Sequence, residues 1–578
     1  MAQRGDAEAA VHAGGGRSRG APHPEAAALN TGGDRGPTPR TAFAVLVAAG
    51  ILLSRIAGLV RERVFAHYLG NSDAAGAFKA ALRIPNFLQN LFGEGVLSAS
   101  FIPVYARLLE EEDEELAGRV AGVVATVLAL AVSAIVLVGV LATPAIIDLV
   151  APGFHGDVRL LTIRIVRILF PGVGLLVMSA WCLGILNSHH KFFLSYVAPV
   201  FWNLAMIATL VALGGRLAQY PLAVALAWGA VVGSALQFGM QVPFVFRYAP
   251  RVRFALDTSL APVREVFRNL GPVVVSRGVV QLSAYIDGMI ASFLGPAAVA
   301  SLGYAQNLYL LPIGLFGMSV AAAELPQMSR ATGTRDEVFA SLRARLDRGL
   351  RQIAFFVIPS VVAFVVLGRY LVAALYQTGR FGEDDTRYVW YILVGSAVGL
   401  LAATLGRLYS SAFYALRDTR TPLRFAIVRV VLTGALGYLS AFPLRPLMVA
   451  ALERAGVPLP QIAGGTLGLG AIGLTASAGV AGWVEFLLLR SALGARIGRV
   501  AVPVGFQVRL WSCAAVAAAV ALAGGHLYAR AVAQRAPLAH PVAVLVVIAG
   551  VYGVGYFLGA MALGIPEARR TIGRFLAT

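Results

Sequence analysis

Residues 41–69 read TAFAVLVAAGILLSRIAGLVRERVFAHYL, an apolar stretch long enough to cross the hydrocarbon core of a membrane as one helix. The pair Ser54-Arg55 interrupts this stretch near its middle. An ionised side chain at membrane depth costs about 2.5 to 3.5 kcal/mol on insertion scales, so helices keep such groups mainly where they face a wet cavity or a partner. The segment therefore predicts a membrane helix whose polar face is turned toward the protein interior.

The same order of residues occurs twice in the chain. Ser-Arg at 54–55 precedes Tyr-Leu-Gly at 68–70, and Ser-Arg at 276–277 precedes Phe-Leu-Gly at 293–295. Each copy continues with Leu-Phe-Gly and a proline, namely Leu91-Phe92-Gly93 with Pro103 and Leu315-Phe316-Gly317 with Pro326. The second copy begins six predicted membrane segments after the first, at the seventh helix. An even offset gives both copies the same orientation. The sequence therefore predicts a parallel repeat of two six-helix lobes.

The composition is that of a membrane protein. The chain has 578 residues, of which 58% are hydrophobic and 13% are charged, and its mean hydropathy is +0.75. The formal net charge is +19, but the basic residues form short clusters between apolar stretches and no face that could follow phosphates. We therefore expect contact with anionic membrane lipids and no binding of nucleic acid.

The sequence contains no signature of catalysis or of a bound cofactor. It has no G-x-x-x-x-G-K-[ST] phosphate loop, no H-E-x-x-H motif and no nucleophile elbow. Its two cysteines, Cys182 and Cys513, lie in apolar segments, where neither a disulfide framework nor a zinc site is expected. We therefore expect a protein that is not an enzyme and that uses no cofactor or metal.

Apolar segments follow one another from Thr41 onward. We predict fourteen membrane helices, near 41–69, 74–106, 118–150, 159–187, 192–214, 219–246, 262–294, 297–328, 350–376, 387–414, 422–442, 464–489, 504–529 and 540–564. The expected fold class is an all-α polytopic membrane bundle with an N-lobe at 41–250, a C-lobe at 251–495 and two further helices within 496–578. Residues 1–40, rich in Gly, Ala, Pro and Arg, predict a disordered tail that lacks the apolar core of a signal peptide.

Arginines in the connections predict the orientation of the helices. Lys and Arg near membrane ends are retained on the cytoplasmic side. From about Arg247 onward, every second connection between predicted helices carries a basic cluster, such as Arg343, Arg345 and Arg348. The alternate connections carry at most two basic residues each. We therefore expect both termini to be cytoplasmic.

Polar residues at helical spacing mark a candidate site in the first two helices. They are Ser54, Arg55, Arg61 and Glu62 in the first helix and Lys79, Arg83, Asn86, Asn90 and Glu94 in the second. A guanidinium group binds phosphate oxygens bidentately, so this pattern suits an anionic substrate. The sequence leaves open that some of the arginines reach lipid head groups or pair with Glu62 and Glu94.

Four polar residues in the second lobe form a further candidate group. Arg277, Gln281 and Asp287 interrupt an otherwise apolar segment, and Glu324 follows three alanines. Such residues bind a monovalent coupling ion or form pairs between the lobes, and the sequence leaves both alternatives open.

Several stretches resemble the MurJ (MviN) family of lipid II flippases, within the multidrug/oligosaccharidyl-lipid/polysaccharide exporter superfamily. The most specific are 54–62 (SRIAGLVRE) and 83–95 (RIPNFLQNLFGEG), supported by 151–154, 185–187, 375–381 and 419–422. The resemblance covers the chain from about Thr41 to its last residues.

The resemblance implies a flippase of the bacterial inner membrane with fourteen helices. Helices one, two, seven and eight would line a cationic cavity for the pyrophosphate and sugar-peptide head group of lipid II, and helices thirteen and fourteen would form a groove for the polyprenyl tail. Cavity roles carry over to Ser54, Arg55, Arg61, Arg83, Asn86 and Glu94. The family is thought to be driven by an ion or by the membrane potential.

Three charges that the family often has are absent from this chain. Gly76 stands in place of an Asp, and Gln89 and Asn307 stand in place of arginines. The expected function is lipid II translocation by alternating access. Two alternatives stay open, a flippase for another polyprenyl-linked glycan and a membrane scaffold that transports nothing. The inward arginines argue against export of a cationic drug, since like charges repel.

Overall fold

The computed structural model describes residues 39–329, 334–462, 465–532 and 540–576. Side chains at 39–48, 94, 272–284, 529, 532 and 572–576 lie outside this description. The chain divides into a unit that ends at Val45 and a second unit that runs from Leu46 onward. In the first unit, the structure describes only the start of the first helix. The predicted tail lies outside the described residues up to position 38.

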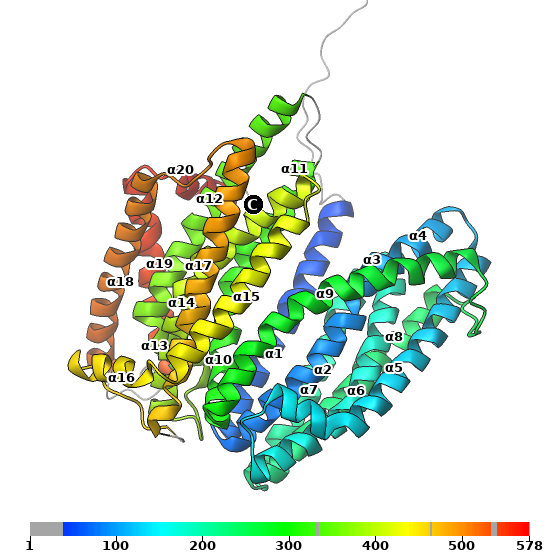
Figure 1. The fold of residues 1–578 in the computed structure, drawn as a ribbon, viewed down its shortest axis with the longest axis horizontal. Helices are drawn as coiled ribbons and strands as arrows, with labels where there is room; N and C mark the ends of the chain where they lie inside the picture. The colour runs from blue at the N-terminus through cyan, green and yellow to red at the C-terminus, as the bar shows by residue number, and fades with distance from the viewer. Residues whose placement is uncertain (1–38, 330–333, 463–464, 533–539, 577–578) are drawn as a thin grey trace, which may run out of the picture. The chain divides into compact units, whose positions relative to one another are not determined.

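The described residues form helices and no strand, which confirms the predicted all-α class (Figure 1). The first part of the chain forms α1 (Pro39–Leu69), α2 (Asp73–Phe92), α3 (Glu94–Ser100), α4 (Ile102–Glu110), α5 (Glu114–Val150), α6 (Gly156–Ser188), α7 (Phe192–Leu213) and α8 (Gln219–Tyr248). We call these helices the N-lobe.

The second part of the chain forms the C-lobe. Its elements are α9 (Ala261–Phe293), α10 (Pro296–Pro312), η1 (Ile313–Met318), α11 (Ser319–Ser329), α12 (Arg335–Val362), η2 (Ala363–Leu367), α13 (Gly368–Tyr376), α14 (Glu383–Ala415), α15 (Arg420–Ala441), α16 (Arg445–Arg454), η3 (Gly465–Leu467) and α17 (Gly470–Ile497). Three helices follow it, α18 (Val504–Val532), α19 (Pro541–Ala562) and α20 (Pro566–Leu576).

Side-chain caps fix where several helices begin. At α2, Ser72 Oγ accepts a hydrogen bond from Ala75 N at 3.3 Å, and at α5, Asp113 Oδ1 accepts one from Leu116 N at 2.9 Å. Thr334 forms a reciprocal capping box at the start of α12. These side chains satisfy N–H groups for which a helix has no partner of its own. The polar loop residues therefore set boundaries that the apolar pattern places only approximately.

Eleven helices, or runs of consecutive helices, are long and apolar enough to cross a membrane, counted over the described residues. They correspond to every predicted segment except the first, second and seventh. Those three segments contain α1, α2 and α9, which carry most of the candidate charged residues. The chain is a multi-pass membrane protein, and the count of fourteen spans stays a prediction.

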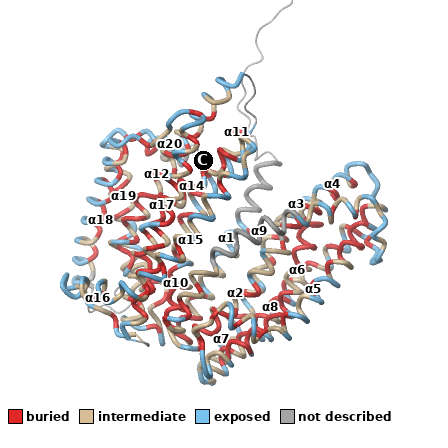
Figure 2. Tube along the Cα trace, in the orientation of Figure 1, coloured by how far each residue is buried: buried red, intermediate tan, exposed pale blue. Residues whose placement is uncertain are grey.

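Most helices pack with other helices of the same lobe, whereas α9 contacts α3, α5 and α2 of the N-lobe as well as α15, α10 and α17 of the C-lobe (Figure 1). In the N-lobe, α6 contacts α2, α5 and α8, and α7 lies along α8. In the C-lobe, α14 contacts α10, α12 and α17, and α15 lies along α17. The pair α18 and α19 packs on α12 and α13. Figure 2 shows buried residues along the inner faces of both lobes. The lobe boundaries at 250 and 495 themselves stay a prediction.

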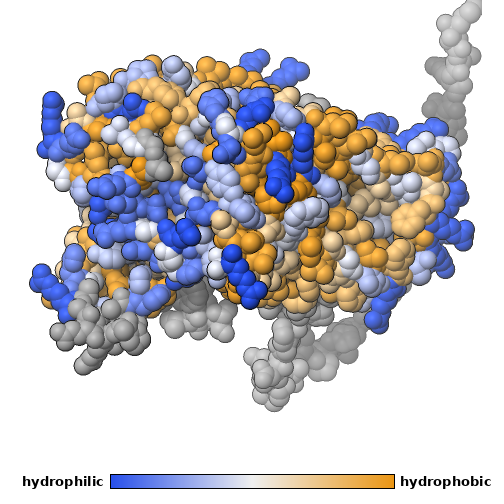
Figure 3. Space-filling view, turned by 90° about the horizontal axis from the view of Figure 1, so that it is seen from below, coloured by the Kyte–Doolittle hydropathy of each residue, from blue (hydrophilic) through white to orange (hydrophobic). Residues whose placement is uncertain are grey.

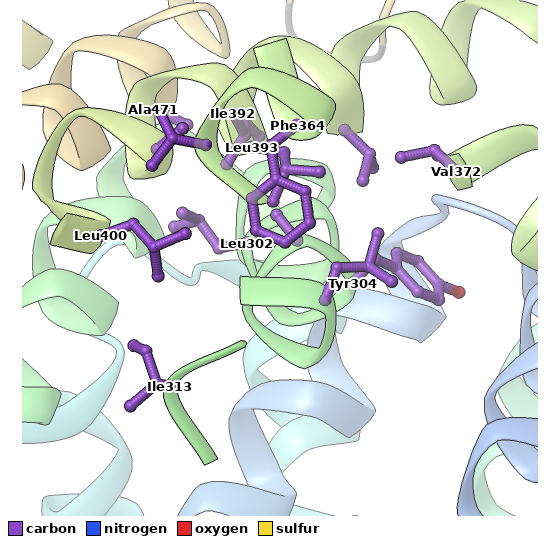
Figure 4. Close-up of a cluster of buried hydrophobic side chains, with 14 of the residues drawn as sticks. Leu302, Tyr304, Ile313, Phe364, Val372, Ile392, Leu393, Leu400 and Ala471 are labelled. Carbon is purple, nitrogen blue, oxygen red and sulfur yellow. The ribbon is translucent and has the colours of Figure 1, made fainter. Parts of the chain in front are cut away.

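Large apolar side chains fill the C-lobe and also cover much of the outer surface. Figure 4 shows Leu302, Phe364, Ile392 and Leu400 converging from α10, η2 and α14. On the outside, Leu141 of α5 is 69% exposed, and Figure 3 shows hydrophobic side chains over much of one face of the molecule. An exposed apolar surface of this extent suits contact with lipid tails.

The two copies of the sequence repeat share backbone features. Gly70 follows α1 with φ 58°, and Gly295 follows α9 with φ 106°, a region that residues with a Cβ rarely adopt. The helix after each turn is then interrupted, because α2 ends at Gly93 and α10 passes into the π-helical turn η1, which contains Gly317. Matching positions of the repeat therefore have the same structural role in both lobes.

Gly76 lies at a close approach of α2 to the start of α10. A Cβ at position 76 would lie 2.2 Å from the carbonyl oxygen of Pro296, far inside contact distance. The aspartate that the resemblance places at this position therefore has no room while the two helices stay this close.

We predict that Gly76→Ala forces α2 and α10 apart and destabilises the protein by about 1 to 3 kcal/mol, the usual cost of overpacking. The loss of stability is measured by heating the purified protein and monitoring its unfolding by size-exclusion chromatography. Gly215→Ala is the matched control, because a Cβ at 215 meets no atom within 4 Å. Equal unfolding temperatures for the two variants would contradict the close packing.

Candidate functional site

Arg55 extends from the middle of α1 to the C-lobe. Its guanidinium nitrogens would lie 3.7 and 3.9 Å from a Cβ built on Gly314 of η1. Arg55 is exposed, and among the described ion pairs none includes it. An unpaired guanidinium is costly in lipid, so Arg55 requires water or an anion beside it if it lies at membrane depth.

Arg83 of α2 also reaches the C-lobe. A Cβ on Gly288 of α9 would lie 1.6 Å from its Nη1, so the guanidinium rests directly on the α9 backbone. Tyr285 donates a hydrogen bond from its hydroxyl to the Arg83 carbonyl at 2.7 Å. The charge of Arg83 interacts with that of Asp287, which lies on α9 next to Gly288. The Oδ1 atom of Asp287 is buried and has no hydrogen-bond partner among the described residues. Both mid-helix arginines therefore face the opposite lobe.

Arg61, Glu62 and Lys79 of α1 and α2 form an ion cluster in which Glu62 is buried and the two cations are half-buried, with Lys79 over the ring of Tyr304 on α10. Glu62 accepts from Arg61 Nη2 at 2.6 Å and pairs through its other oxygen with Lys79. Arg61 also donates to Asn203 Oδ1 at 3.0 Å and lies over the ring of Trp202. The pairing of Arg61 with Glu62 that the sequence left open is thus present. Loss of Glu62 would leave two half-buried cations without a counter-charge, which is strongly destabilising.

The C-lobe contains three charged residues that the sequence analysis did not single out. Arg429 of α15 pairs with Glu485 of α17 at 3.2 Å, and the charge of Arg407 on α14 interacts with both. Each interrupts an apolar helix, so the rule that drew attention to Arg55 would also have found them. Asp287 interacts with Arg429 as well as with Arg83, which connects this cluster to the N-lobe arginine.

The other predicted residues have varied surroundings. Ser54 is half-buried, Asn86 and Asn90 are exposed on α2, and Glu324 lies 3.7 Å from Arg345. The side chains of Glu94, Arg277 and Gln281 lie outside the described residues. Of the positions without the family's charge, Gln89 and Asn307 are half-buried, and Asn307 forms a hydrogen bond with Tyr376.

Asp418 fixes the start of α15, the helix that carries Arg429. It accepts hydrogen bonds from Thr421 Oγ1 at 2.6 Å and from the N–H groups of Arg420 and Thr421 at 3.0 Å. The bonds from Thr421, together with Arg496 at 2.7 Å, lower the pKa of Asp418 to about 2. The carboxylate therefore remains ionised at physiological pH and holds the α14–α15 turn.

The C-terminal end of α1 is bound by the last turn of α13 and by the loop that follows it. Arg63 donates to the carbonyl oxygens of Ala374 and Leu375, and His67 Nδ1 shares a hydrogen bond of 2.8 Å with Thr378 Oγ1. Arg380 N donates to His67 O at 2.9 Å. The loop lies in the stretch 375–381 that supported the family resemblance, so that stretch has a structural role in joining the lobes.

The N-terminal part of α10 adds hydrogen bonds at the same end of α1. Tyr304, which is fully buried, donates from its hydroxyl to Gly70 O at 2.7 Å, and Ser301 donates to Asn71 Oδ1 at 2.9 Å. Both partners lie in the turn between α1 and α2. Contacts between the lobes are therefore dense at the end of the bundle where α1 and α9 terminate.

An apolar groove of about 410 Å³ lies between the C-lobe and α18. Val361 and Val365 line one side, and Trp511, Ala515 and Ala519 line the other. The groove involves the first of the two additional membrane helices together with α12 and η2, whereas α19 does not contribute to it. No group of three His, Cys, Asp or Glu side chains among the described residues could hold a metal ion.

Comparison of the sequence with known proteins gives one consistent family. The family model described as lipid II flippase MurJ matches residues 65–539. The lipid II flippase MurJ of Burkholderia cenocepacia is 32% identical over 402 residues, which cover 68% of this chain and 77% of the relative. The probable lipid II flippase MurJ of Rhizobium meliloti is 32% identical over 471 residues, which cover 77% and 79%.

Comparison with solved structures gives the same fold. A lipid II flippase MurJ in an inward closed conformation superposes with a TM-score of 0.69 at 21% identity, over 90% of this chain and 99% of that one. An inward-facing multidrug resistance transporter of the MATE family, within the MOP superfamily, superposes with a TM-score of 0.56 at 19% identity, over 78% and 98%. At these identities the likeness establishes the fold alone.

We predict that cysteines at 67 and 378 are joined by a short bifunctional thiol reagent, because the His67 and Thr378 side chains touch. The test uses the protein with Cys182 and Cys513 replaced by serine, and mass spectrometry detects the linked peptides. Thr378→Cys with Leu137→Cys on the exposed face of α5 is the control pair, which should stay unlinked. Failure to link positions 67 and 378 under all membrane conditions would contradict the closure.

Proposed function

The chain belongs to the lipid II flippase MurJ family, and from this premise we propose that it moves lipid II from the cytoplasmic to the periplasmic leaflet of the bacterial inner membrane. The proposal includes transport and no catalytic step. The observation that supports it best is the placement of Arg55 and Arg83, whose guanidinium groups extend from the N-lobe to the backbone of the C-lobe. They lie about 21 and 15 Å along their helices from the turn at 70–72.

The pyrophosphate of lipid II is the group that these arginines would bind. A guanidinium fork matches phosphate oxygens, and the interaction is stronger at membrane depth than in water. Arg55 forms no ion pair with any of the described residues, whereas Arg83 is balanced in part by Asp287. We propose that entering pyrophosphate takes over Arg83 from Asp287, with Ser54, Asn86 and Glu94 completing the site. Arg61 joins it when the contact with Glu62 opens.

Alternating access accounts for the contacts between the C-terminal end of α1 and the C-lobe. We propose that both termini lie in the cytoplasm, and in that orientation this end of α1 would face the periplasm and its contacts would belong to a state closed on the periplasmic side. The moving bodies in this proposal are the lobes at 41–250 and 251–495. Their parallel repeat provides two similar bodies that can rock against each other around the substrate. The hydrogen bonds of His67, Gly70 and Asn71 would then open and close in each cycle.

The groove beside α18 is suited to the polyprenyl tail and to membrane lipids. Its lining is almost wholly apolar, which matches a hydrocarbon chain. We assign the segment 496–578 to this role.

The acidic residues of the C-lobe favour pairing over the coupling-ion alternative. Asp287 has Arg83 and Arg429 as charged neighbours, and Glu324 has Arg345. An arginine near each carboxylate already supplies the positive charge that a monovalent cation would bring.

A flippase for another polyprenyl-linked glycan is the second candidate function. It is favoured by one observation, since the contact of Gly76 with Pro296 leaves no room for the family's aspartate. The head-group end of the site therefore differs from that of relatives with a charge there. A scaffold without transport is less consistent with this site, because it gives no reason to keep Arg55 in mid-helix without a counter-charge from the part of the chain that the structure describes.

Complementation of a bacterium depleted of its own flippase tests the proposal. The wild-type chain should restore lipid II on the periplasmic leaflet, whereas Arg55→Gln and Arg83→Gln should reduce its exposure at least about tenfold, as expected for loss of a charge-assisted contact. Arg424→Gln is the matched control, since Arg424 is exposed near the start of α15. Immunoblots of membranes establish equal amounts of each protein.

Two outcomes would contradict the proposal. Unrestored lipid II exposure with wild-type protein present in the membrane would exclude lipid II as the substrate. Full activity of both arginine variants would exclude the assigned site.

A further inference from the structure

Three ionisable side chains come together within the membrane part of the C-lobe. Arg407 lies eight residues before the end of α14, and Arg429 lies nine residues after the start of α15. At 1.5 Å per residue, both are about 12 to 14 Å from a helix end, well inside a hydrocarbon core about 30 Å thick. Glu485 contributes from α17. Three helices therefore bring charge to one place at membrane depth.

The charges in this cluster do not balance. Glu485 pairs with Arg429 at 3.2 Å, and no carboxylate of the described residues lies within ion-pair distance of Arg407. Arg407 is exposed. The cluster thus carries one excess positive charge, and a free guanidinium at this depth is tolerated only where water or an anion can reach it.

The cluster belongs to the same space as Arg83. Asp287 interacts with Arg83 of the N-lobe and with Arg429 of the C-lobe. Tyr309 of α10, in turn, interacts with Arg407, Arg429 and Asp287. These charge interactions relate Arg83 on α2 to Asp287 on α9, and Asp287 in turn to Arg429 on α15 and, through Tyr309, to Arg407 on α14, and we call this series the row.

The number of charges indicates which anion each end of the row suits. At the N-lobe end, a pyrophosphate that displaces Asp287 from Arg83 would meet the full charge of Arg83 and that of Arg55, which pairs with no carboxylate among the described residues, and two positive charges suit a group with two or more negative ones. Arg407 and Arg429, with Glu485 beside them, leave a net charge of one, which suits a single carboxylate held by a guanidinium fork. The peptide moiety of a lipid-linked muropeptide ends in such a carboxylate.

We propose that Arg407, positioned beside the Arg429–Glu485 pair, forms a second anion subsite that binds a carboxylate of the substrate's peptide. The inference rests on the proposed function and adds a determinant of head-group specificity on the C-lobe side. A substrate held by its pyrophosphate on α1 and α2 and by its peptide on α14 would contact both lobes at once.

Binding of two ligands to the full-length protein in nanodiscs of neutral lipid tests the inference. The ligands are lipid II and undecaprenyl pyrophosphate, which lacks the sugar and the peptide. Arg407→Gln should weaken binding of lipid II about tenfold and leave undecaprenyl pyrophosphate binding unchanged. Arg83→Gln should weaken both ligands, and Arg424→Gln should weaken neither. Glu485→Gln removes the competing carboxylate, so it should strengthen binding of lipid II.

The possible failures are distinguishable. Absence of lipid II binding by the wild-type protein would overturn the proposed function. Normal wild-type binding with unchanged affinity in Arg407→Gln, or an equal loss for both ligands, would overturn the second subsite alone. An Arg407→Gln effect that occurs only in discs with anionic phospholipid would assign the residue to a lipid phosphate and also overturn it.

Discussion

The structure depends on one constraint, that a charged side chain cannot face hydrocarbon at membrane depth without a large cost. The chain nevertheless places arginines in the middle of α1, α2, α14 and α15. Each of them is directed to the other lobe, to a carboxylate or to a neighbouring charged cluster. The charged side chains therefore lie where the helices face one another, because they are costly in contact with lipid. The outer faces remain apolar and can contact the lipid tails.

The charges separate into two kinds according to their partners. Glu62 balances Arg61 and Lys79 within the N-lobe, and this cluster joins α1 to α2 and, through Asn203, to α7. Arg55 and Arg407 instead lack a carboxylate partner among the described residues. The first kind holds a lobe together as a unit, and the second leaves positive potential between the lobes. A rigid lobe and an attractive interlobe space are both needed for a carrier of anions.

Much of the fold could be predicted from the sequence because it follows from local patterns. The repeat of 54–70 at 276–295 predicted two similar lobes, and the matching Gly70 and Gly295 both have positive φ. The hydrophobic stretches predicted the helices, although the breaks at Gly93 and in η1 were not foreseen. The family resemblance and the chemistry of the inward arginines led to the same class of protein.

Contacts between distant parts of the chain could not be predicted in the same way. Arg61 finds Asn203 and Trp202 on α7, and His67 finds Thr378, through packing that no local pattern encodes. The close approach of Gly76 to Pro296 likewise appears only in three dimensions. Arg407, Arg429 and Glu485 are a different case, because their isolation in apolar helices is visible in the sequence.

Water access to the middle of α1 and α2 measures the central claim most directly. A small, charged, membrane-impermeant thiol reagent should label Arg55→Cys and Arg83→Cys in a chain with Cys182 and Cys513 replaced by serine. It should leave Leu137→Cys, 61% exposed on α5, unlabelled in the lipid. Labelling of position 137 without labelling of 55 or 83 would show that the arginines face no hydrated space, and the account would be wrong.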